Sequence, residues 1–480
     1  MKITEYLWEA GGKDYVDKTN PFKKIGFDGD KARLGWVKPP SWDLIENTLK
    51  KCEKFIGDKN EFIFIGMGGS INGIKTLTAF KKKNKIYCID NLDPQALLET
   101  VAKIRKINKI MVIPISKSAT TKETQLIAHT IKDYFCKIVG REKIKKYFLW
   151  LVDSDSVFKW KTLGWEGFSY LPLQFDGRTD IGGRFSSPHT LVFFLPLFLI
   201  MNKNLQKVKR IYDSYLYYRN KVISKAFQDA KRYRDLKNGY FLIKSPSLVL
   251  EHFKIWITQL FQESLGSKKK GFSVKTFVAD RVLRDKMFIP LNLTLRSVNP
   301  LVEIMCIMCY LQHFVAYYAY FKRINFVNQP YVEKYKKKMK TLTSLSLKIK
   351  VEVDFKKLIK IIKKRLKPHH KFIETVLYLY PHKTLIEKIG KILREKFPSK
   401  KILVFVGSDW NHHSYQAAYQ DKNTLYILLT KSNYLDKIPS FNRNKLKENI
   451  KALRTISYAT HLTLKKNSIL VSFSDISFTY

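Results

Sequence analysis

Short apolar runs alternate with helical patterns over the N-terminal part of the chain. The runs lie at residues 61–65, 85–90, 110–115 and 147–152, and each has the length of a buried strand. The first and third are followed by a polar or glycine-containing loop and then by a pattern typical of a helix. Strand, loop and helix repeated at this spacing predict a doubly wound parallel sheet, so we expect the α/β fold class.

The C-terminal part shows the same theme less regularly. Strand-like runs occur at residues 240–243 and 402–406, and buried helices are predicted over 253–265 and 300–321. Asp354 precedes an amphipathic pattern and is a candidate N-cap. These patterns extend the α/β prediction to the whole chain.

The length predicts several domains. The chain has 480 residues, and a domain usually has roughly 100–200. A polar, lysine-containing stretch at residues 202–215 is the predicted boundary. We predict an N-terminal extension over residues 1–45, a first α/β domain over 46–205, and a second over 206–480 that includes C-terminal helices.

The charge balance is strongly basic. The chain has 88 Lys and Arg against 41 Asp and Glu, which gives a formal net charge of +47. Such an excess is typical of proteins that bind nucleic acid or an anionic membrane surface. Here, however, the lysines are spread along the chain and no compact tail carries them. A solvated lysine-rich surface is the simpler interpretation, and we predict no specific nucleic-acid partner.

The apolar runs and the cysteines predict the compartment. Residues 191–201 are too few to cross a bilayer, and residues 304–321 contain Gln312 and His313, so buried helices are expected for both. The five cysteines have no paired spacing, and the first residues lack the apolar core of a signal peptide. We therefore expect a cytoplasmic protein with no membrane partner.

A glycine loop, GMGGS at residues 66–70, lies between a predicted strand and a predicted helix. Glycines let the backbone approach a ligand closely, and the amides of a helix N-terminus attract anions. A dinucleotide site is one interpretation, because Asp90 ends the next strand, although Ile71 occupies the position of the third fingerprint glycine. A glycine turn that binds nothing is the other.

Two further loops have the composition of anion sites. Residues 116–121, SKSATT, place four hydroxyls and one lysine ahead of a predicted helix, which suits a dianionic phosphate. An ordinary helix cap would need one hydroxyl. Arg184 follows Asp180 and two glycines, so its guanidinium either faces a ligand or lies on a tight surface turn.

These loops carry a family resemblance. GMGGS, SKSATTKET and DIGGRFSS, in this order, resemble motifs of the glucose-6-phosphate isomerase (phosphoglucose isomerase) family. Three more segments are similar to family motifs: residues 259–266 (QLFQESLG), 329–336 (QPYVEKYK) and 407–416 (GSDWNHHSYQ). The histidine motif follows the lysine motif here, an order that resembles the isomerase part of transaldolase–isomerase fusions. The resemblance implies two sugar-isomerase (SIS) domains of the doubly wound α/β type.

The resemblance also implies roles for individual residues. Glu263 would be the base that moves a proton between C2 and C1, Arg184 would stabilise the enediolate, and His412 would open the sugar ring with help from Lys336. His413 adjoins His412, and the spacing of the motif favours His412. The implied substrate-binding residues are Gly69, Ser70, Ser116, Lys117, Ser118, Thr121, Gln259 and Gln329.

The function implied is a cytoplasmic isomerase of glycolysis and gluconeogenesis. It would interconvert D-glucose 6-phosphate and D-fructose 6-phosphate through a cis-enediolate, without metal or cofactor, and family members are often homodimers. Cys306 and Cys309 lie in an apolar helical pattern and are interpreted as core residues. The alternatives are added phosphomannose isomerase activity, a non-catalytic sugar-phosphate sensor, or a nucleic-acid binder supported by charge alone.

Overall fold

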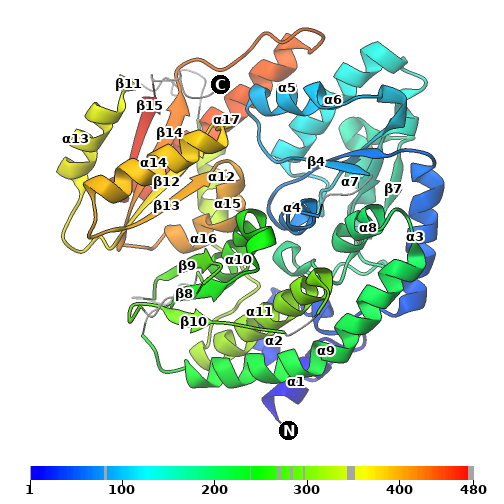
Figure 1. Cartoon of the computed structure of the whole chain (residues 1–480), viewed down its shortest axis with the longest axis horizontal. Coiled ribbons are helices and arrows are strands. Elements are labelled where there is room, and N and C mark those ends of the chain that lie inside the picture. Colours follow the sequence, from blue (N-terminus) through cyan, green and yellow to red (C-terminus); the bar gives the residue numbers. More distant parts are fainter. Residues whose placement is uncertain are drawn as a thin grey trace. The chain divides into compact units, whose positions relative to one another are not determined.

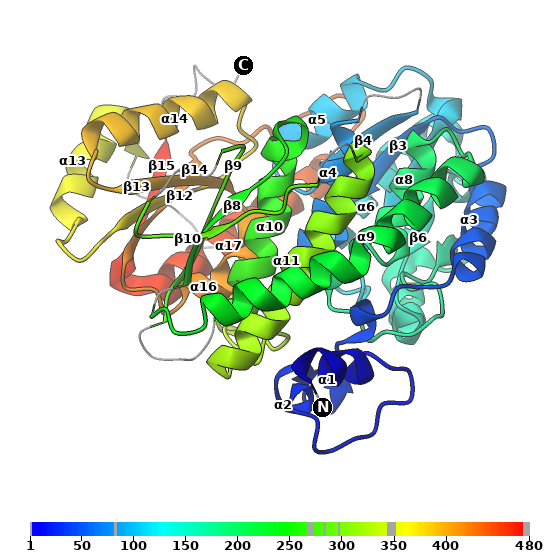
Figure 2. The ribbon, with the colours of Figure 1, turned by 60° about the horizontal axis from the view of Figure 1, so that its bottom comes forward.

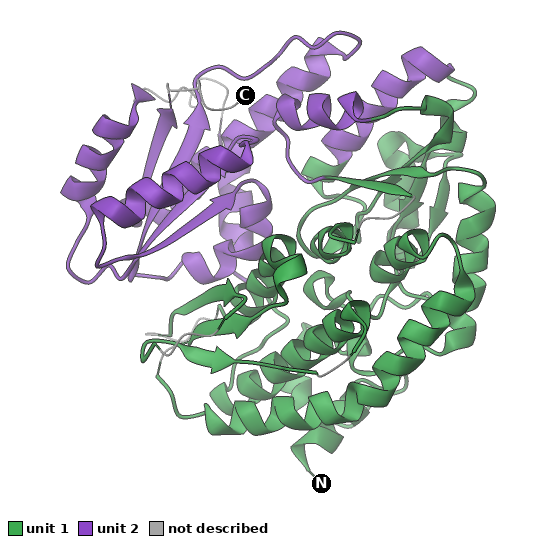
Figure 3. Cartoon of the chain, in the orientation of Figure 1, with its two compact units in different colours: residues 1–88, 104–124, 141–328 green, residues 89–103, 125–140, 329–480 purple. Residues whose placement is uncertain are grey.

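The chain divides into two units by the contacts among its residues, and each is described here by itself (Figure 3). Unit 1 comprises residues 1–88, 104–124 and 141–328, and unit 2 comprises residues 89–103, 125–140 and 329–480. The boundary predicted after residue 205 falls inside unit 1, so the units and the predicted domains divide the chain differently. The computed structural model describes residues 2–80, 84–237, 239–266, 272–281, 285–295, 298–342 and 352–473.

The first sheet of unit 1 forms from the apolar runs of the N-terminal part. Its strands are β3 (Glu61–Ile65), β4 (Lys85–Ile89), β5 (Ile110–Pro114), β6 (Leu149–Leu151) and β7 (Ser169–Leu171). The order β4-β3-β5 continues through two isolated bridges, one from Val112 to Phe148, directly before β6, and one from Ile115 to Leu151 in β6. β6 in turn pairs with β7. The pairs β3–β5 and β6–β7 are parallel. The run predicted at residues 147–152 gives a shorter strand, because residues 144–147 form a 3₁₀ turn.

Helices pack against this sheet in unit 1 (Figure 1). They include α3 (Trp42–Ile56), α4 (Asn72–Thr78), the short α7 (Val157–Trp160) and α8 (Leu191–Ile200). Every residue of α8 is buried, which confirms the buried helix predicted at residues 191–201. Both α3 and α4 contact α8, so this helix forms the centre of the layer.

A second sheet in unit 1 has the order β10-β8-β9, with parallel pairs throughout. Its strands are β8 (Gly239–Lys244), β9 (Val274–Ala279) and β10 (Ile289–Leu291). The accompanying helices are α9 (Leu205–Arg232), α10 (Leu250–Leu265) and α11 (Pro300–Lys322), and α9 and α11 run side by side (Figures 1 and 2). The strand predicted at residues 240–243 and both helices predicted nearby are confirmed.

Helix α11 is the one described helix that is long and apolar enough to cross a membrane. Its most apolar stretch is 94% buried inside the structure. Cys306 and Cys309 lie in this helix and are both fully buried, which confirms their interpretation as core residues.

The N-terminal extension also belongs to unit 1. It forms α1 (Ile3–Ala10), α2 (Phe22–Ile25) and the short antiparallel pair β1 (Phe27–Asp28) and β2 (Lys31–Ala32). The Asn325 side-chain amide donates to the carbonyl of Phe27 at 2.8 Å, and the Phe326 amide donates to the carbonyl of Ile25 at 3.0 Å. The extension is therefore hydrogen-bonded to the segment that follows α11.

Unit 2 is built on a five-stranded parallel sheet with the order β11-β15-β14-β12-β13. The strands are β11 (Glu352–Val353), β12 (Phe372–Tyr378), β13 (Lys401–Val406), β14 (Thr424–Lys431) and β15 (Ser468–Phe473). Phe372 lies opposite Lys401 on β13 and opposite Thr424 on β14, so β12 is paired on both sides. The strand predicted at residues 402–406 is confirmed as β13.

The helices of unit 2 include two from early in the chain, α5 (Pro94–Ala102) and most of α6 (Lys122–Val139). Helix α14 packs on β13, while α17 packs on β12, β14 and β15. The predicted N-cap is confirmed: the Asp354 carboxylate accepts from the Lys357 amide at 2.6 Å. The later helices are α12 (Val332–Lys340), α13 (Phe355–Arg365), α14 (Lys383–Lys396), α15 (Asp409–His413), α16 (Tyr415–Ala418) and α17 (Arg443–Leu464). Parallel sheets with helices in both units confirm the α/β fold class.

Candidate active site

Two glycine loops meet in unit 1. The GMGGS loop follows β3 and forms a 3₁₀ turn at Gly68–Ser70, and the GGRFS loop forms another at Gly183–Phe185. A Cβ on Gly69 would overlap the carbonyl of Gly183, and the Ser186 hydroxyl donates to the Gly69 carbonyl at 3.1 Å. The two backbones can touch only because position 69 has no side chain. This contact fixes the loop that carries Arg184 against the loop predicted to bind an anion.

The hydroxyl loop, residues 116–121, lies between β5 and the start of α6. The Ser116 hydroxyl donates to the Thr121 hydroxyl at 3.3 Å, and the Ser118 and Thr120 hydroxyls are 3.0 Å apart. Ser116 is buried, whereas Ser118 lies nearer the surface. The hydroxyls of this loop are thus paired with one another directly ahead of the start of α6, the position at which an anion is predicted to bind.

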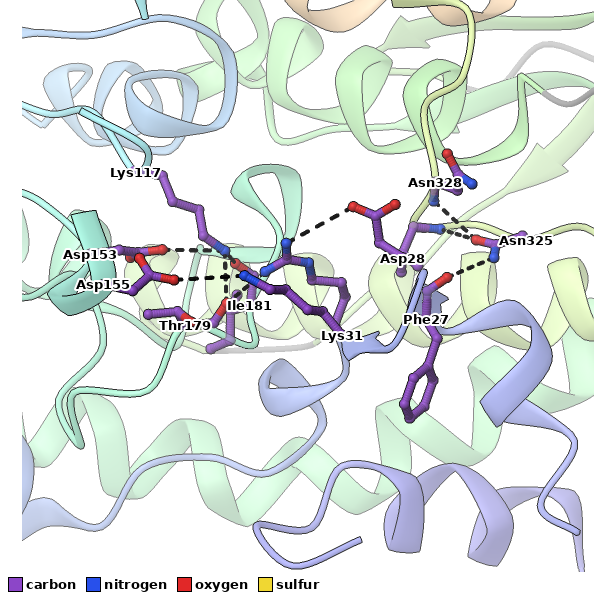
Figure 4. Close-up of polar contacts among 12 residues, drawn as sticks. Phe27, Asp28, Lys31, Lys117, Asp153, Asp155, Thr179, Ile181, Asn325 and Asn328 are labelled. Carbon is purple, nitrogen blue, oxygen red and sulfur yellow. Dashed lines mark hydrogen bonds and ion pairs between the residues drawn. The ribbon is translucent and has the colours of Figure 1, made fainter. Parts of the chain in front are cut away.

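Lys117 has a more specific placement than the sequence indicates (Figure 4). Its ammonium lies 3.5 Å from the Asp153 carboxylate and donates to the carbonyls of Thr179 and Ile181. Burial raises the pKa of Asp153 to about 6, against the opposing effect of the Lys117 charge. Burial likewise lowers the pKa of Lys117, and Asp153 opposes that change. Lys117 thus connects the hydroxyl loop to residues 179–181, which lead directly into the GGRFS loop.

A small pocket opens where these loops meet. Side chains from all three motif loops line it, together with side chains from the ends of β6 and β7 and from the start of α8. The lining residues are Ser70, Lys117, Asp153, Leu173, Gln174, Ile181, Gly183, Ser186 and Thr190. Hydroxyls, an amide and the paired Lys117 ammonium and Asp153 carboxylate line this pocket, which suits a polar ligand.

Arg184 and Glu263 form a buried ion pair. The Arg184 Nη1 atom lies 3.1 Å from Glu263 Oε1, and both side chains are less than one-tenth exposed. Arg184 also donates from Nε to the Ser264 hydroxyl at 2.7 Å and from Nη2 to the Phe326 carbonyl at 2.6 Å. Burial lowers the pKa of Arg184, and the Glu263 charge opposes that change. The guanidinium is therefore held in one orientation beside the carboxylate.

The other oxygen of Glu263 is held from its own helix. Gln259 precedes Glu263 by one turn of α10, and its Nε2 donates to Glu263 Oε2 at 2.8 Å. The structure thus brings together Gly69, Arg184, Gln259 and Glu263, four residues that the sequence predicts for the site. Sequence reasoning missed Ser264, which lies inside a quoted motif, and Asp153, which directly follows a predicted strand.

In unit 2 the histidine motif follows β13. His412 is half-buried, whereas the His413 ring is buried edge-on to Phe405, with its Nδ1 2.6 Å from the Ser414 hydroxyl. Trp410 fixes the same turn, because its indole N–H donates to the Glu374 carboxylate on β12 at 2.6 Å. The two adjacent histidines thus differ in burial.

The lysine motif also lies in unit 2. The Tyr331 amide donates to the Gln416 side chain at 3.1 Å, so the start of this motif contacts the end of the histidine motif. Gln329 is half-buried. Lys336 is exposed on α12, and its ammonium lies 3.0 Å from Glu333 one turn earlier. Within unit 2, the motifs are joined through Tyr331, and Lys336 lies on the solvent-facing side of its helix.

Among the described residues, His, Cys, Asp and Glu side chains nowhere gather in groups of three or more that could hold a metal ion. The groups that do gather are hydroxyls, amides and the buried Arg184–Glu263 pair. Together they can bind an anion and move a proton.

Comparison with known proteins finds glucose-6-phosphate isomerases among the relatives of this chain. Residues 52–205 match the family model described as phosphoglucose isomerase. Among curated relatives, the glucose-6-phosphate isomerase of Mycoplasma mobile is 26% identical over 294 residues, covering 56% of this chain and 65% of the relative. That of Latilactobacillus sakei is 29% identical over 249 residues, covering 48% and 54%. The chain thus spans less than two thirds of the length of these relatives.

Solved structures show weaker similarity. A hypothetical protein from Thermus thermophilus has a TM-score of 0.48 and 19% identity, covering 70% of this chain and 94% of its own. A glucose-6-phosphate isomerase from Chlamydia trachomatis has a TM-score of 0.47 and 12% identity, covering 75% and 81%.

Proposed function

Residues 52–205 belong to the phosphoglucose isomerase family, and from this premise we propose that the protein interconverts D-glucose 6-phosphate and D-fructose 6-phosphate. The observation that carries the proposal is the buried pair of Arg184 and Glu263, 3.1 Å apart beside the joined glycine loops. A sensor would need the anion loop alone, whereas this pair adds the groups that isomerisation requires. The proposal includes a cytoplasmic location and a homodimer.

The chemistry follows from the two charged groups. The Glu263 carboxylate takes the proton from C2 of the open-chain aldose, which leaves an enediolate, and returns it to C1 to give the ketose. Arg184 stays charged at any working pH and faces the negative oxygen that develops. Because its Ser264 and Phe326 contacts hold the guanidinium, little reorganisation is needed when that charge forms.

Substrate binding is assigned to the hydroxyl loop. Ser116, Ser118 and Thr121 supply hydroxyl donors for the phosphate. Lys117 holds the loop in place through its contact with Asp153 and adds positive charge nearby. Ring opening is assigned to His412 and Lys336 on the motif resemblance. Histidine suits this step because it both donates and accepts a proton near neutral pH.

The test is a coupled assay of the purified protein with fructose 6-phosphate, following glucose 6-phosphate, with and without EDTA. We expect turnover that EDTA does not change. Binding of fructose 6-phosphate without turnover would replace the proposal with a sugar-phosphate sensor, and the absence of both would refute it. Mannose 6-phosphate in the same assay tests for a second activity.

A further inference from the structure

A buried amide outside the predicted site contacts it. Asn72 is the first residue of α4 and is fully buried where α4 packs against α10. Its Nδ2 atom donates to Gln259 Oε1 at 3.0 Å. Its Oδ1 atom is buried and accepts no hydrogen bond from any described residue. An unpaired buried oxygen costs stability, and an apolar side chain at this position would avoid that cost. The presence of an amide here is therefore explained by its N–H₂ group, which donates to Gln259.

The Asn72 contact reinforces the orientation of Gln259. A glutamine amide has a donor end and an acceptor end, and here its acceptor end is occupied by Asn72. Its donor end faces Glu263 Oε2, at 2.8 Å, so the Asn72 contact and the carboxylate favour the same orientation of Gln259. Turned over, Gln259 would set its carbonyl oxygen against a carboxylate oxygen and its N–H₂ group against that of Asn72.

The carboxylate is thereby held at both oxygens. Arg184 donates to Oε1 and the oriented Gln259 donates to Oε2, so rotation of the carboxylate is restricted. Proton transfer from carbon requires the carboxylate within hydrogen-bond reach and aligned with the C–H bond, and a small misplacement costs a large factor in rate. We propose that Asn72 is a positioning residue for Glu263 that acts through Gln259; this rests on the proposed function for Glu263 as the base.

The experiment compares Asn72→Leu with Thr76→Val in the isomerase assay. Thr76 is an equally buried polar residue one turn along α4, and its hydroxyl bonds to the carbonyl of Asn72 within the helix. We expect Asn72→Leu to lower kcat by about 10- to 100-fold with KM changed by less than about threefold. Thr76→Val should stay within about threefold of wild type in both constants. Wild-type turnover after Asn72→Leu would overturn the proposal.

A double variant separates positioning from general damage. If Asn72 acts through Gln259, Gln259→Leu should lower kcat by a similar factor, and adding Asn72→Leu should lower it no further. If the double variant instead lowers kcat by the product of the two single-variant factors, Asn72 does not act through Gln259. If Asn72→Leu does not fold, Asn72→Ser, which is smaller and too short to reach Gln259, serves in its place.

A spectroscopic readout keeps this test separate from that of the function. The infrared carboxylate band of Glu263 can be isolated as the difference between wild type and Glu263→Gln. Losing the donor at Oε2 should shift that band in the same direction in Asn72→Leu and in Gln259→Leu. An unshifted band in Asn72→Leu refutes the positioning role. A shifted band in Asn72→Leu, where the wild-type chain shows no turnover, supports the positioning role and refutes the isomerase function.

Discussion

Glu263 is the residue on which the proposed reaction depends. Glutamine at this position keeps the shape of the side chain and removes the proton acceptor. We predict that Glu263→Gln lowers kcat by about 10²–10⁴-fold, the range of general-base catalysis, while a sugar-phosphate inhibitor still binds. Turnover and inhibitor binding should be measured on the same preparation. Near-normal turnover would show that another group is the base.

The two adjacent histidines should differ in effect. His412 is half-buried, whereas His413 is packed against Phe405 and hydrogen-bonded to Ser414. We predict that His412→Ala slows turnover of the ring-closed substrate by about 10²–10⁴-fold, because ring opening needs a proton donor and acceptor, and that an open-chain analogue is affected less.

His413→Ala is the matched variant. It removes a buried ring, so it should lower the temperature of unfolding and leave the ratio of open-chain to ring-closed turnover unchanged. If that ratio changes in His413→Ala and not in His412→Ala, the register of the motif is wrong by one residue.

Single residues were predictable where a side chain carries a motif. Arg184 and Glu263 come from separate motifs, and the structure brings them to 3.1 Å. The contacts that orient Arg184 were harder to predict from the sequence. Its partner at Phe326 is a backbone carbonyl, which a residue of any type would present. Lys117 shows the same limit: its pairing with Asp153 depends on where the ends of β5 and β6 meet in the fold.

At the scale of elements, the hydroxyl loop should control affinity. Removing a hydrogen bond to a charged group costs roughly 1.5–3 kcal/mol, so Ser116→Ala or Thr121→Ala should raise KM for fructose 6-phosphate by about 10- to 150-fold with kcat less affected. Because these two hydroxyls are bonded to each other at 3.3 Å, the double variant should be less than additive.

The control for the loop is Thr455→Ala. This half-buried threonine donates to the carbonyl of Lys451 in its own helix, α17, so KM should stay at the wild-type value. An unchanged KM in both loop variants as well would remove the phosphate assignment.

Strands could be predicted from the sequence where an uninterrupted apolar run ends at a turn. The apolar runs that form β3, β5 and β13 are of this kind. β12 is buried over all its residues, yet Glu374 and Thr375 interrupt its apolar pattern. Glu374 is tolerated there because it accepts the indole N–H of Trp410, a contact that sequence spacing does not reveal.

For the whole molecule, buried histidine predicts acid sensitivity. His189 is buried, with Nδ1 2.7 Å from the Trp36 carbonyl and Nε2 2.7 Å from the Tyr215 hydroxyl. Burial, reinforced by the positive charge of Arg219, lowers the pKa of His189 from 6.5 to about 3. As pH falls below 6.5 the unfolded chain takes up this proton and the folded chain does not, so stability is lost on the order of 4 kcal/mol by about pH 3.

Denaturant unfolding at pH 7 and about pH 4.5 measures this loss. His189→Gln removes the titrating ring, so the difference in unfolding free energy between the two pH values should shrink. His382→Gln changes an exposed ring and should leave the difference as in wild type. Equal pH dependence in all three proteins would contradict the assignment to His189.

The net charge of +47 predicts weak, unspecific attraction to polyanions. Because the lysines are dispersed, DNA binding should weaken steeply with salt and show no preference among sequences. Titrations of labelled duplexes between about 50 and 200 mM salt measure both properties. A tight, sequence-selective complex at physiological salt would promote nucleic-acid binding to a function.

The division of the molecule was the least predictable level. Composition placed a boundary at residues 202–215, where the chain is polar, but α9 begins there and packs along α11. The exposed face of a long amphipathic helix is rich in polar residues, so its composition alone resembles that of a linker. Segments 89–103 and 125–140 join unit 2 through contacts with residues far along the chain, such as Asn91 with Leu379.

This interleaving has a consequence for fragments of the protein. Each unit contains three segments of chain, so no single cut separates a complete unit 1 from a complete unit 2. A piece beginning at residue 329 would lack Asp93, the buried partner of Lys431 at 3.0 Å, and Thr130, the partner of Asn449. Leaving a buried ammonium without its carboxylate is costly enough to prevent independent folding of a small piece. Two fragments cut at residue 328 would therefore regain structure by complementation, each supplying what the other lacks.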